Sequence, residues 1–403
     1  MSHRTSLIDL GNSTAHHEQC DRWNDLWAAS TSSLPLGRWE QIELWQETFA
    51  PNQRLRGLII ERDNRWIAAL PLVSKRLLGM LPIGDVPYDD WTGSLEWIVA
   101  EDLADDPTVY DQMITALGAL RCPLLRIAQM ATESKANLGF MQAISRAGLP
   151  VDVAARHHVG MIEVCGPNAP LSWEAYQAAW TGNFRRQMRK MMRRAEELGG
   201  VELVVHRSVD GHRLEELVRE GFAIEDQSWK GRSRTSVVRT PGMLSYFIRQ
   251  ARLLAETGEL TLLFLRHGGQ SIAFEYGWTC RRIYYSPKVG FDDRFSHLSP
   301  GQVLRLLWLE KLFAERSHDA VDFAGPLSEA TEKWTTRSYP MQRLIAATGP
   351  SGRVLLGAGR TAIRLRQQGQ ALATKIKQSA SALRRSQPGA APSQSASEAT
   401  SQS

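Results

Sequence analysis

Four consecutive residues, Ser299, Pro300, Gly301 and Gln302, open an apolar helix-forming segment, and their types suit the binding of a phosphate. Serine is a preferred N-cap whose hydroxyl accepts a hydrogen bond from the next turn, and proline has the φ angle of the first helical position. Such a start leaves several backbone N–H groups free at the positive end of the helix dipole, where a phosphate or pyrophosphate can bind. The same residues also make an ordinary helix start, so both interpretations stay open.

Two carboxylates and a tyrosine lie in the strands expected around this helix. Glu275 stands in the middle of the apolar strand 271–279, Tyr285 in the next strand, and Asp322 in the strand Ala320–Ala324 that follows the helix. A charged residue inside an apolar strand costs free energy unless it has a partner or a task. The chemistry they suit is general acid–base catalysis, with a carboxylate as base and the tyrosine as acid. Salt bridges and ordinary packing are the alternatives.

The elements that must position these residues follow from the hydrophobic periodicity. Alternating residues on both sides of a turn predict two β-hairpins, at 58–73 around Asp63-Asn64 and at 260–279 around His267-Gly268-Gly269. Each hairpin is followed by strand, helix and strand patterns, which in the first copy comprise helix 108–120, strand 124–127, helix 138–147 and strand 159–164. The repeated order predicts two copies of one α/β unit. Only the second copy has the Ser-Pro-Gly helix start, so we expect the chemistry there and acceptor binding in the first.

Length and composition set the domain organisation. A chain of 403 residues with 43% hydrophobic content can bury a substantial core and suggests two domains with a tail. We predict a disordered segment at 1–20, an N-terminal domain at 21–165, a C-terminal domain at 166–348 and a low-complexity tail at 349–403.

A basic amphipathic helix is expected at Phe184–Leu198, between the two copies. Its apolar stripe consists of Phe184, Met188, Met191, Ala195 and Leu198, and its other faces carry Arg185, Arg186, Arg189, Lys190, Arg193 and Arg194. Either the chain's own acidic residues pair with these cations, or the cations bind phosphate from a cofactor, a nucleotide-linked acceptor or RNA. DNA is not expected as a partner, because no motif that reads a DNA duplex accompanies the charge.

Most of the excess positive charge belongs to the tail. Residues 349–403 hold 8 of the 48 Lys and Arg but 1 of the 43 Asp and Glu, whereas the whole chain has a net charge of +5. Seven of these cations lie in 360–385, where a flexible solvated tail is the default interpretation and peripheral contact with an anionic membrane surface is the alternative. No signal peptide or apolar run of membrane-spanning length is present, so we expect a cytoplasmic protein, and the alternative for the tail would place it at the inner membrane face. The four scattered cysteines predict no metal site.

Five segments together resemble a known family. They are GGQSIAFEYGW (268–278), IYYSPKVGFD (283–292), LSPGQVL (298–304), AVDFAG (320–325) and EKW (332–334). In this order and spacing the chain resembles a GNAT-type acyltransferase of the CelD-like subgroup linked to exopolysaccharide and cellulose biosynthesis, which is related to the Fem-type aminoacyltransferases. One departure concerns Gln302, which stands where the usual pyrophosphate loop has glycine or alanine.

The resemblance implies a fold, a co-substrate and site residues. The fold would be α/β, with tandem GNAT-like domains whose mixed central sheets are flanked by helices. Acyl-CoA, such as acetyl-CoA, would bind at Ser299–Gln302 without a metal, and Glu275 or Asp322 would be the base. Acceptor contacts would come from Trp229, Lys230, Arg232, Lys333 and Trp334.

The function expected on these grounds is transfer of an acyl group to an amine or hydroxyl of a small-molecule, glycan or other cell-envelope precursor. One alternative is a transferase that takes its acyl group from aminoacyl-tRNA, which the basic helix would suit. The other is a non-catalytic GNAT-like scaffold for a polysaccharide synthase.

Overall fold

The computed structural model describes residues 3–10, 16–77, 79–209 and 211–359. The chain divides into two compact units, Met1–Gly352 and Arg353–Ser403, and all elements below belong to the first unit. The predicted basic segment 360–385 of the tail lies outside the described residues. Within the described ranges, no helix has both the length and the apolar character needed to cross a membrane.

The first half of the folded unit contains the N-terminal strand and the first predicted hairpin. Its elements are β1 (His3–Asp9), α1 (His16–Ala28), α2 (Trp39–Phe49), β2 (Leu55–Arg62), β3 (Arg65–Leu77), β4 (Leu81–Asp85), β5 (Tyr88–Asp89), β6 (Gly93–Ser94), β7 (Ile98–Val99), α3 (Pro107–Leu117), β8 (Leu124–Ala131), α4 (Lys135–Arg146) and β9 (Val151–Glu163).

The second half repeats the order of hairpin, strand, helix and strand after an insertion of helices. Its elements are α5 (Trp173–Ala178), α6 (Gly182–Glu197), β10 (Glu202–His206), α7 (Gly211–Asp226), α8 (Trp229–Arg232), α9 (Met243–Glu256), β11 (Leu260–His267), β12 (Gln270–Cys280), β13 (Ile283–Phe291), α10 (Pro300–Glu315), β14 (Ala320–Pro326), α11 (Glu329–Glu332) and β15 (Arg337–Ala347).

Both predicted hairpins are confirmed, and the backbone of their turns explains why the turn residues predicted them. Asp63 and Asn64 have φ angles of 49° and 65°, and Gly268 and Gly269 have φ angles of 55° and 80°. Two consecutive positive φ angles in a two-residue loop are the mark of the type I′ turn, whose twist matches that of the flanking strands. These short loops fix the pairing of β2 with β3 and of β11 with β12.

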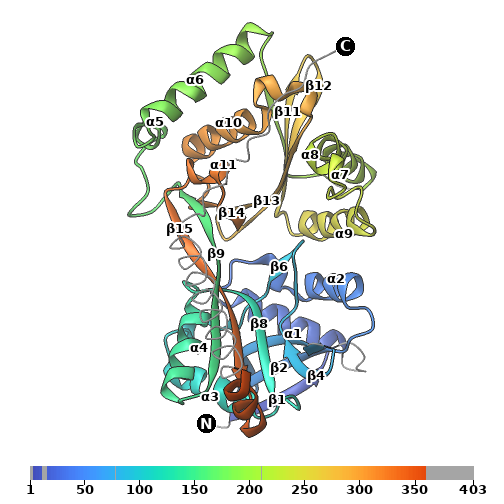
Figure 1. The fold of residues 1–403 in the computed structure, drawn as a ribbon, viewed down its shortest axis with the longest axis vertical. Coiled ribbons are helices and arrows are strands. Elements are labelled where there is room, and N and C mark those ends of the chain that lie inside the picture. Colours follow the sequence, from blue (N-terminus) through green and yellow to red (C-terminus); the bar gives the residue numbers. More distant parts are fainter. Residues whose placement is uncertain (1–2, 11–15, 78, 210, 360–403) are drawn as a thin grey trace, which may run out of the picture. The chain divides into compact units, whose positions relative to one another are not determined.

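The two halves share one mixed sheet because they exchange their last strands. The strand order is β1-β2-β3-β4-β8-β15-β9-β14-β13-β12-β11-β10. The last strand of the first half, β9, pairs with β14 of the second half, while β15 returns to pair with β8 of the first half. The long strands β9 and β15 also pair with each other (Figure 1). The predicted α/β class is therefore confirmed, but residues 21–165 and 166–348 do not form separate sheets.

The prediction of disorder at 1–20 is wrong for part of this segment. Residues His3–Asp9 form β1, which pairs antiparallel with β2 along its whole length. Leu7 and Ile8 pack against the hydrophobic core, and Leu10 is fully buried. Pairing with β2 satisfies the backbone polar groups, which outweighs the polar composition of the segment.

Helices cover both faces of the sheet in the second half. Helices α7 and α9 lie on one face of β11–β13, and α10 lies on the other with α5 and α6 (Figure 1). Because side chains alternate along a strand, β12 directs Phe274, Tyr276 and Trp278 toward α7 and α9. Residues on the opposite face of the same strand meet α10. This division decides which predicted site residues can meet.

Candidate active site

The two central strands of the second half separate partway along their length. Strands β13 and β14 are parallel and pair only from Ile283 to Tyr285, with Tyr285 opposite Asp322. Beyond this pair β13 continues to Phe291, and the pairing of β14 with β9 shifts register before Pro326. Irregular pairing of this kind often lies beside active sites. The separation places Tyr285 and Asp322 at the mouth of the gap.

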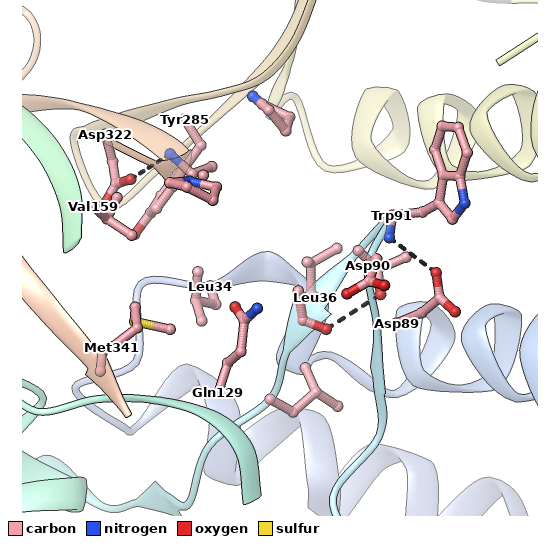
Figure 2. Close-up of a pocket in the computed structure, with 18 of the residues that line it drawn as sticks. Leu34, Leu36, Asp89, Asp90, Trp91, Gln129, Val159, Tyr285, Asp322 and Met341 are labelled. Atoms are coloured by element: carbon pink, nitrogen blue, oxygen red, sulfur yellow. Dashed lines mark hydrogen bonds between the residues drawn. The ribbon is translucent and has the colours of Figure 1, made fainter. Parts of the chain in front are cut away.

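A pocket of about 450 Å³ opens at this gap and is lined by both halves of the unit. Figure 2 shows Asp322 and Tyr285 on one side of the pocket and Asp89, Asp90 and Trp91 across from them. Other polar residues that line it are Glu96, Gln129, Asn137, His157, Gln250, Lys288 and Tyr339. A concave site with a few convergent polar groups is where a small-molecule substrate is expected to bind.

Asp322 is the carboxylate that the second half contributes to the described lining of this pocket. Its side chain is buried, and it accepts hydrogen bonds from the Ala324 N–H at 2.7 Å and from the Tyr339 hydroxyl at 2.8 Å. Burial raises the pKa of Asp322 to about 6, although both hydrogen bonds oppose the rise. A carboxylate with a pKa near neutrality suits a general base.

Two tyrosines beside Asp322 keep their protons at neutral pH. Tyr285 shares a hydrogen bond of 2.6 Å with the hydroxyl of Ser33, which belongs to the first half. Burial, followed by the negative charge of Asp322, raises the pKa of both Tyr285 and Tyr339 well above the usual value. The proton donor predicted at Tyr285 therefore lies in the pocket and stays protonated.

The buried state of Asp322 has a consequence for stability. Its pKa of about 6 exceeds that of an exposed aspartate, ~3.9. Between these values the folded protein holds a proton that the unfolded chain has released, so stability from this group falls as pH rises from about 4 to about 6. The unfolding free energy of Asp322→Asn relative to wild type should therefore rise by about 2 to 3 kcal/mol between pH 4 and pH 7. Urea unfolding at several pH values measures this, and a difference that does not change with pH would contradict it.

Glu275, the other predicted base, faces away from the pocket. Its carboxylate is buried on the α10 side of the sheet and accepts a hydrogen bond from the Tyr284 hydroxyl at 2.8 Å. The buried Arg305 acts on it electrostatically, and the Arg305 guanidinium lies 4.7 Å from the centre of the Phe323 ring. Glu275 therefore has the partners of a structural carboxylate.

The start of α10 differs from its prediction in two respects. Ser299 has φ 52° and ψ 52°, and its side chain makes no capping hydrogen bond. Its carbonyl oxygen instead accepts from the N–H groups of Gln302 and Val303, at 2.9 and 3.1 Å. Fewer N–H groups are thus free than expected. Within the described residues, only the Gly301 N–H of this turn has no recorded acceptor.

The side chain of Gln302 explains its departure from the family pattern. Its Oε1 accepts a hydrogen bond from Nε1 of Trp334 at 2.9 Å, which ties the start of α10 to the segment after α11. Trp334 is 1% exposed and packs edge-on against Trp180 and Phe184. Its neighbour Lys333 is exposed. Neither residue lines the pocket of Asp322.

The predicted acceptor-binding segment 229–232 forms the short helix α8 outside this pocket. Lys230 donates to the Glu225 carboxylate at 2.7 Å and to the Val289 carbonyl at 2.9 Å, and Arg232 pairs with Asp293. Trp229 is 56% exposed. The glycine between them is required sterically, because a Cβ atom at Gly231 would lie 1.8 Å from a backbone oxygen. The contacts of this segment are those of a structural brace for β13.

Helix α6 buries the predicted stripe only in part. Phe184, Met188 and Ala195 are buried, but Leu198 is 47% exposed because α6 ends one residue before it. Most of the cations are exposed, and among the described residues no ion pair is recorded for Arg186, Arg189, Lys190 or Arg194. Of the counter-charges expected from the chain's own acids, the described residues supply one, Glu197 beside Arg193.

Glu96 and Lys288 are two of the pocket residues that were not predicted. Glu96 comes from the first half, and its pKa is raised because its carboxyl is desolvated. It lies between Leu95 and Trp97, so it is a charged residue among apolar neighbours, which is the pattern that singled out Glu275. Lys288 follows Tyr285 on β13 and had no local signal, because lysine is common on strand surfaces.

Comparison with known proteins agrees with this geometry. Residues 182–333 match the family model of the acetyltransferase (GNAT) domain, and no curated protein matches the chain. FemX has a similar structure, with 11% identity, 84% of this chain and 96% of that chain covered, and a TM-score of 0.52. A conserved protein of unknown function from Bacteroides thetaiotaomicron VPI-5482 has 10% identity, 81% and 97% coverage, and a TM-score of 0.50. These structures share the fold, and the family match covers the separated strands. The chain therefore contains a GNAT acetyltransferase domain at residues 182–333.

Proposed function

We propose that this protein transfers an acyl group from acyl-CoA to an amine, with Asp322 as the general base. The observation that carries the proposal is the position of Asp322, which lines the pocket at the separation of β13 and β14 and has a pKa of about 6. At neutral pH most of this carboxylate is ionised and can accept a proton from an attacking amine. Glu275 lies on the other face of the sheet and cannot reach the same amine directly.

The remaining groups of the site fit the other needs of acyl transfer. An oxyanion requires preorganised hydrogen-bond donors, and the edge of β13 beyond Tyr285 is not paired with β14. A departing thiolate requires a proton, and the Tyr285 hydroxyl next to Asp322 holds one, but its raised pKa makes it a weak acid, so transfer from it is expected to be slow. The CoA co-substrate would supply the activated acyl carbonyl.

The lining of the pocket favours an amine as acceptor. Four carboxyl groups, from Asp89, Asp90, Glu96 and Asp322, line the pocket together with one lysine, Lys288. Aromatic side chains from Trp91 and Trp278 add flat surfaces. Acidic groups beside aromatic rings attract a cationic ligand and stabilise it. An amine of a polysaccharide or other cell-envelope precursor has this character, in keeping with the CelD-like resemblance.

The start of α10 is the proposed site for the CoA pyrophosphate. The Gly301 N–H has no recorded acceptor in the described chain, and the helix dipole favours an anion there. A Cβ atom at Gly301 would lie 3.5 Å from the Phe291 ring, which is an ordinary contact. The protein itself therefore tolerates a side chain at this position, and a loss of CoA binding would report on the ligand.

Substitution Gly301→Val should weaken CoA binding tenfold or more, about 1.4 kcal/mol, because its branched side chain would obstruct the approach of a pyrophosphate to the backbone. Calorimetric titration with CoA measures the effect. The smaller Gly301→Ala is the matched variant, expected to fold normally and to lose less affinity. Unchanged CoA affinity in folded Gly301→Val would reject this site.

Aminoacyl-tRNA is the alternative donor, favoured by the exposed cations of α6, most of which have no ion pair among the residues that the structure describes. A polyanion would bind such a face with strong salt dependence. Competition separates the two donors. If deacylated tRNA binds at physiological salt and acetyl-CoA does not, the acyl-CoA proposal is replaced. A scaffold without catalysis is indicated only if neither donor binds.

A further inference from the structure

Lys288 is a partly buried lysine in the wall of the candidate active site. It lies on β13 opposite Tyr276, and its side chain lines the same pocket as Tyr285 and Asp322. Its ammonium group lies 4.5 Å from the centre of the Trp91 ring and 5.4 Å from the centre of the Phe247 ring. The first ring belongs to the first half of the unit and the second to α9. Lys288 therefore lies within cation–π distance of one aromatic ring from each half.

The ammonium group of Lys288 has no anionic partner in the described part of the chain. No hydrogen bond or ion pair within bonding distance is recorded for it there. The two carboxylates whose charges favour its protonated form are already bonded elsewhere. Glu225 accepts from Lys230 and from the Val237 N–H, and Asp89 accepts from the Trp91 N–H.

An ammonium that is desolvated without a partner costs free energy. Burial and the neighbouring Lys230 lower the pKa of Lys288 to about 8, so roughly nine-tenths of the group is still charged at pH 7. The cation–π contacts offset part of the desolvation but donate no hydrogen bonds. A ligand that supplies an anion would complete the environment of this cation.

Around Asp322 the pocket wall carries carboxyl groups rather than an ammonium group. The charge of Glu96 helps to raise the pKa of Tyr285 and of Tyr339, so this carboxyl lies near the Asp322 cluster, although it comes from the first half. Asn137 donates to Glu96 at 3.3 Å and holds it in the pocket wall. The pocket thus offers carboxyl groups around Asp322. At Lys288 it offers an ammonium that feels the charges of Glu225 and Asp89 but, among the described residues, is hydrogen-bonded to neither.

We propose that the acceptor is an amine that also carries an anionic group, a phosphate or a carboxylate, and that Lys288 binds this group. The amine half of the inference rests on the proposed function, because it places the reacting nitrogen at Asp322. The anionic half rests on the surroundings of Lys288 alone. Lys288 thereby selects among amines and sets the direction in which the acceptor lies in the pocket.

Three matched sugars test the inference by direct binding, without an acyl donor. D-Glucosamine, D-glucosamine 6-phosphate and glucosaminuronic acid share the amine and differ only in the group at carbon 6. Calorimetric titration at pH 7 should show that wild type binds at least one anionic sugar about 10-fold to 100-fold more tightly than glucosamine, as expected for a charged hydrogen bond in a partly buried site. The two anionic sugars distinguish a phosphate from a carboxylate.

The decisive quantity is the affinity for the better-bound anionic sugar divided by the affinity for glucosamine, measured in Lys288→Met and in wild type. This ratio should fall to about 1 in Lys288→Met, remain above 1 in Lys288→Arg, and be unchanged in Lys311→Met, which removes an exposed lysine paired with Glu315 outside the pocket. If Lys288 only supports the fold, all three sugars should weaken together and the ratio should persist, which overturns the inference. A wild-type protein that shows no preference, or binds none of the sugars, overturns it as well.

Failure of this inference and failure of the proposed function are separable. The titrations require neither CoA nor turnover, so they are unaffected if Asp322 is not the base. The converse result is an enzyme that acylates only amines that lack an anionic group, with a turnover that falls in Asp322→Asn. That result would retain the proposed function and exclude the role of Lys288.

Discussion

Replacing Asp322 by asparagine is expected to lower the turnover of acyl transfer by about 10²-fold to 10⁴-fold, the usual contribution of a general base. The amide cannot accept a proton, yet it has nearly the same size and can still receive the Tyr339 hydroxyl hydrogen bond through its oxygen. CoA binding at the start of α10 should stay nearly unchanged. Thiol release from acetyl-CoA, measured with the best amine acceptor and corrected for folded fraction, gives the result.

Glu275→Gln is the matched control, because Glu275 is also a buried strand carboxylate hydrogen-bonded to a tyrosine. We expect this variant to keep turnover within a few-fold of wild type, with any loss appearing in the melting temperature. The reverse pattern, with Glu275→Gln inactive and Asp322→Asn active, would move the base to the other face of the sheet.

Trp334→Ala is expected to destabilise the protein by about 3 to 5 kcal/mol, the typical cost of deleting a buried tryptophan side chain. Trp334 is 1% exposed, its ring packs against Trp180 and Phe184, and its backbone carbonyl accepts the Tyr176 hydroxyl. The substitution also removes the donor to Gln302. Urea unfolding of the two proteins measures the difference.

A variant of the exposed neighbour Lys333 is the control that distinguishes a structural role of Trp334 from a role in acceptor binding. Lys333→Ala should change stability by less than about 0.5 kcal/mol, as is usual for exposed sites. If Trp334 binds the acceptor, Trp334→Ala would instead raise the KM for the amine while the unfolding free energy stays near that of wild type. That outcome would restore the role that the family resemblance implied for it.

Much of the fold could be predicted because its signals are local. Turn residues with positive φ, Asp63-Asn64 and Gly268-Gly269, determine both hairpins. The helix start at Pro300 was also evident from sequence. The exchange of β9 and β15 was not predictable, since it depends on pairing between residues far apart in sequence, such as Leu344 with Ile127. No local pattern records that partner choice.

The candidate site was predicted only in part for the same reason. Asp322 and Tyr285 were identified in sequence and meet in the pocket, because they are paired in neighbouring strands. Glu96 and Lys288 reach the same pocket from different halves, which only the shared sheet brings together. The residues that the family resemblance implied as acceptor contacts do not line this pocket. Lys230, Arg232 and Trp334 bond to other parts of the fold, and Trp229 and Lys333 are exposed.

The pH dependence of kcat/KM for Asp322→Asn, beside wild type and Glu275→Gln with one common acceptor, tests the central claim most directly. Burial places the pKa of Asp322 at about 6, and the base must be ionised, so the wild-type rate should rise with pH up to this value. Ionisation of the acceptor is common to all three proteins and cancels in the comparison. The account predicts that the rise of kcat/KM with pH near pH 6 is lost in Asp322→Asn and retained in Glu275→Gln. A limb that persists in Asp322→Asn at a near wild-type rate would contradict the assignment of Asp322 as the base.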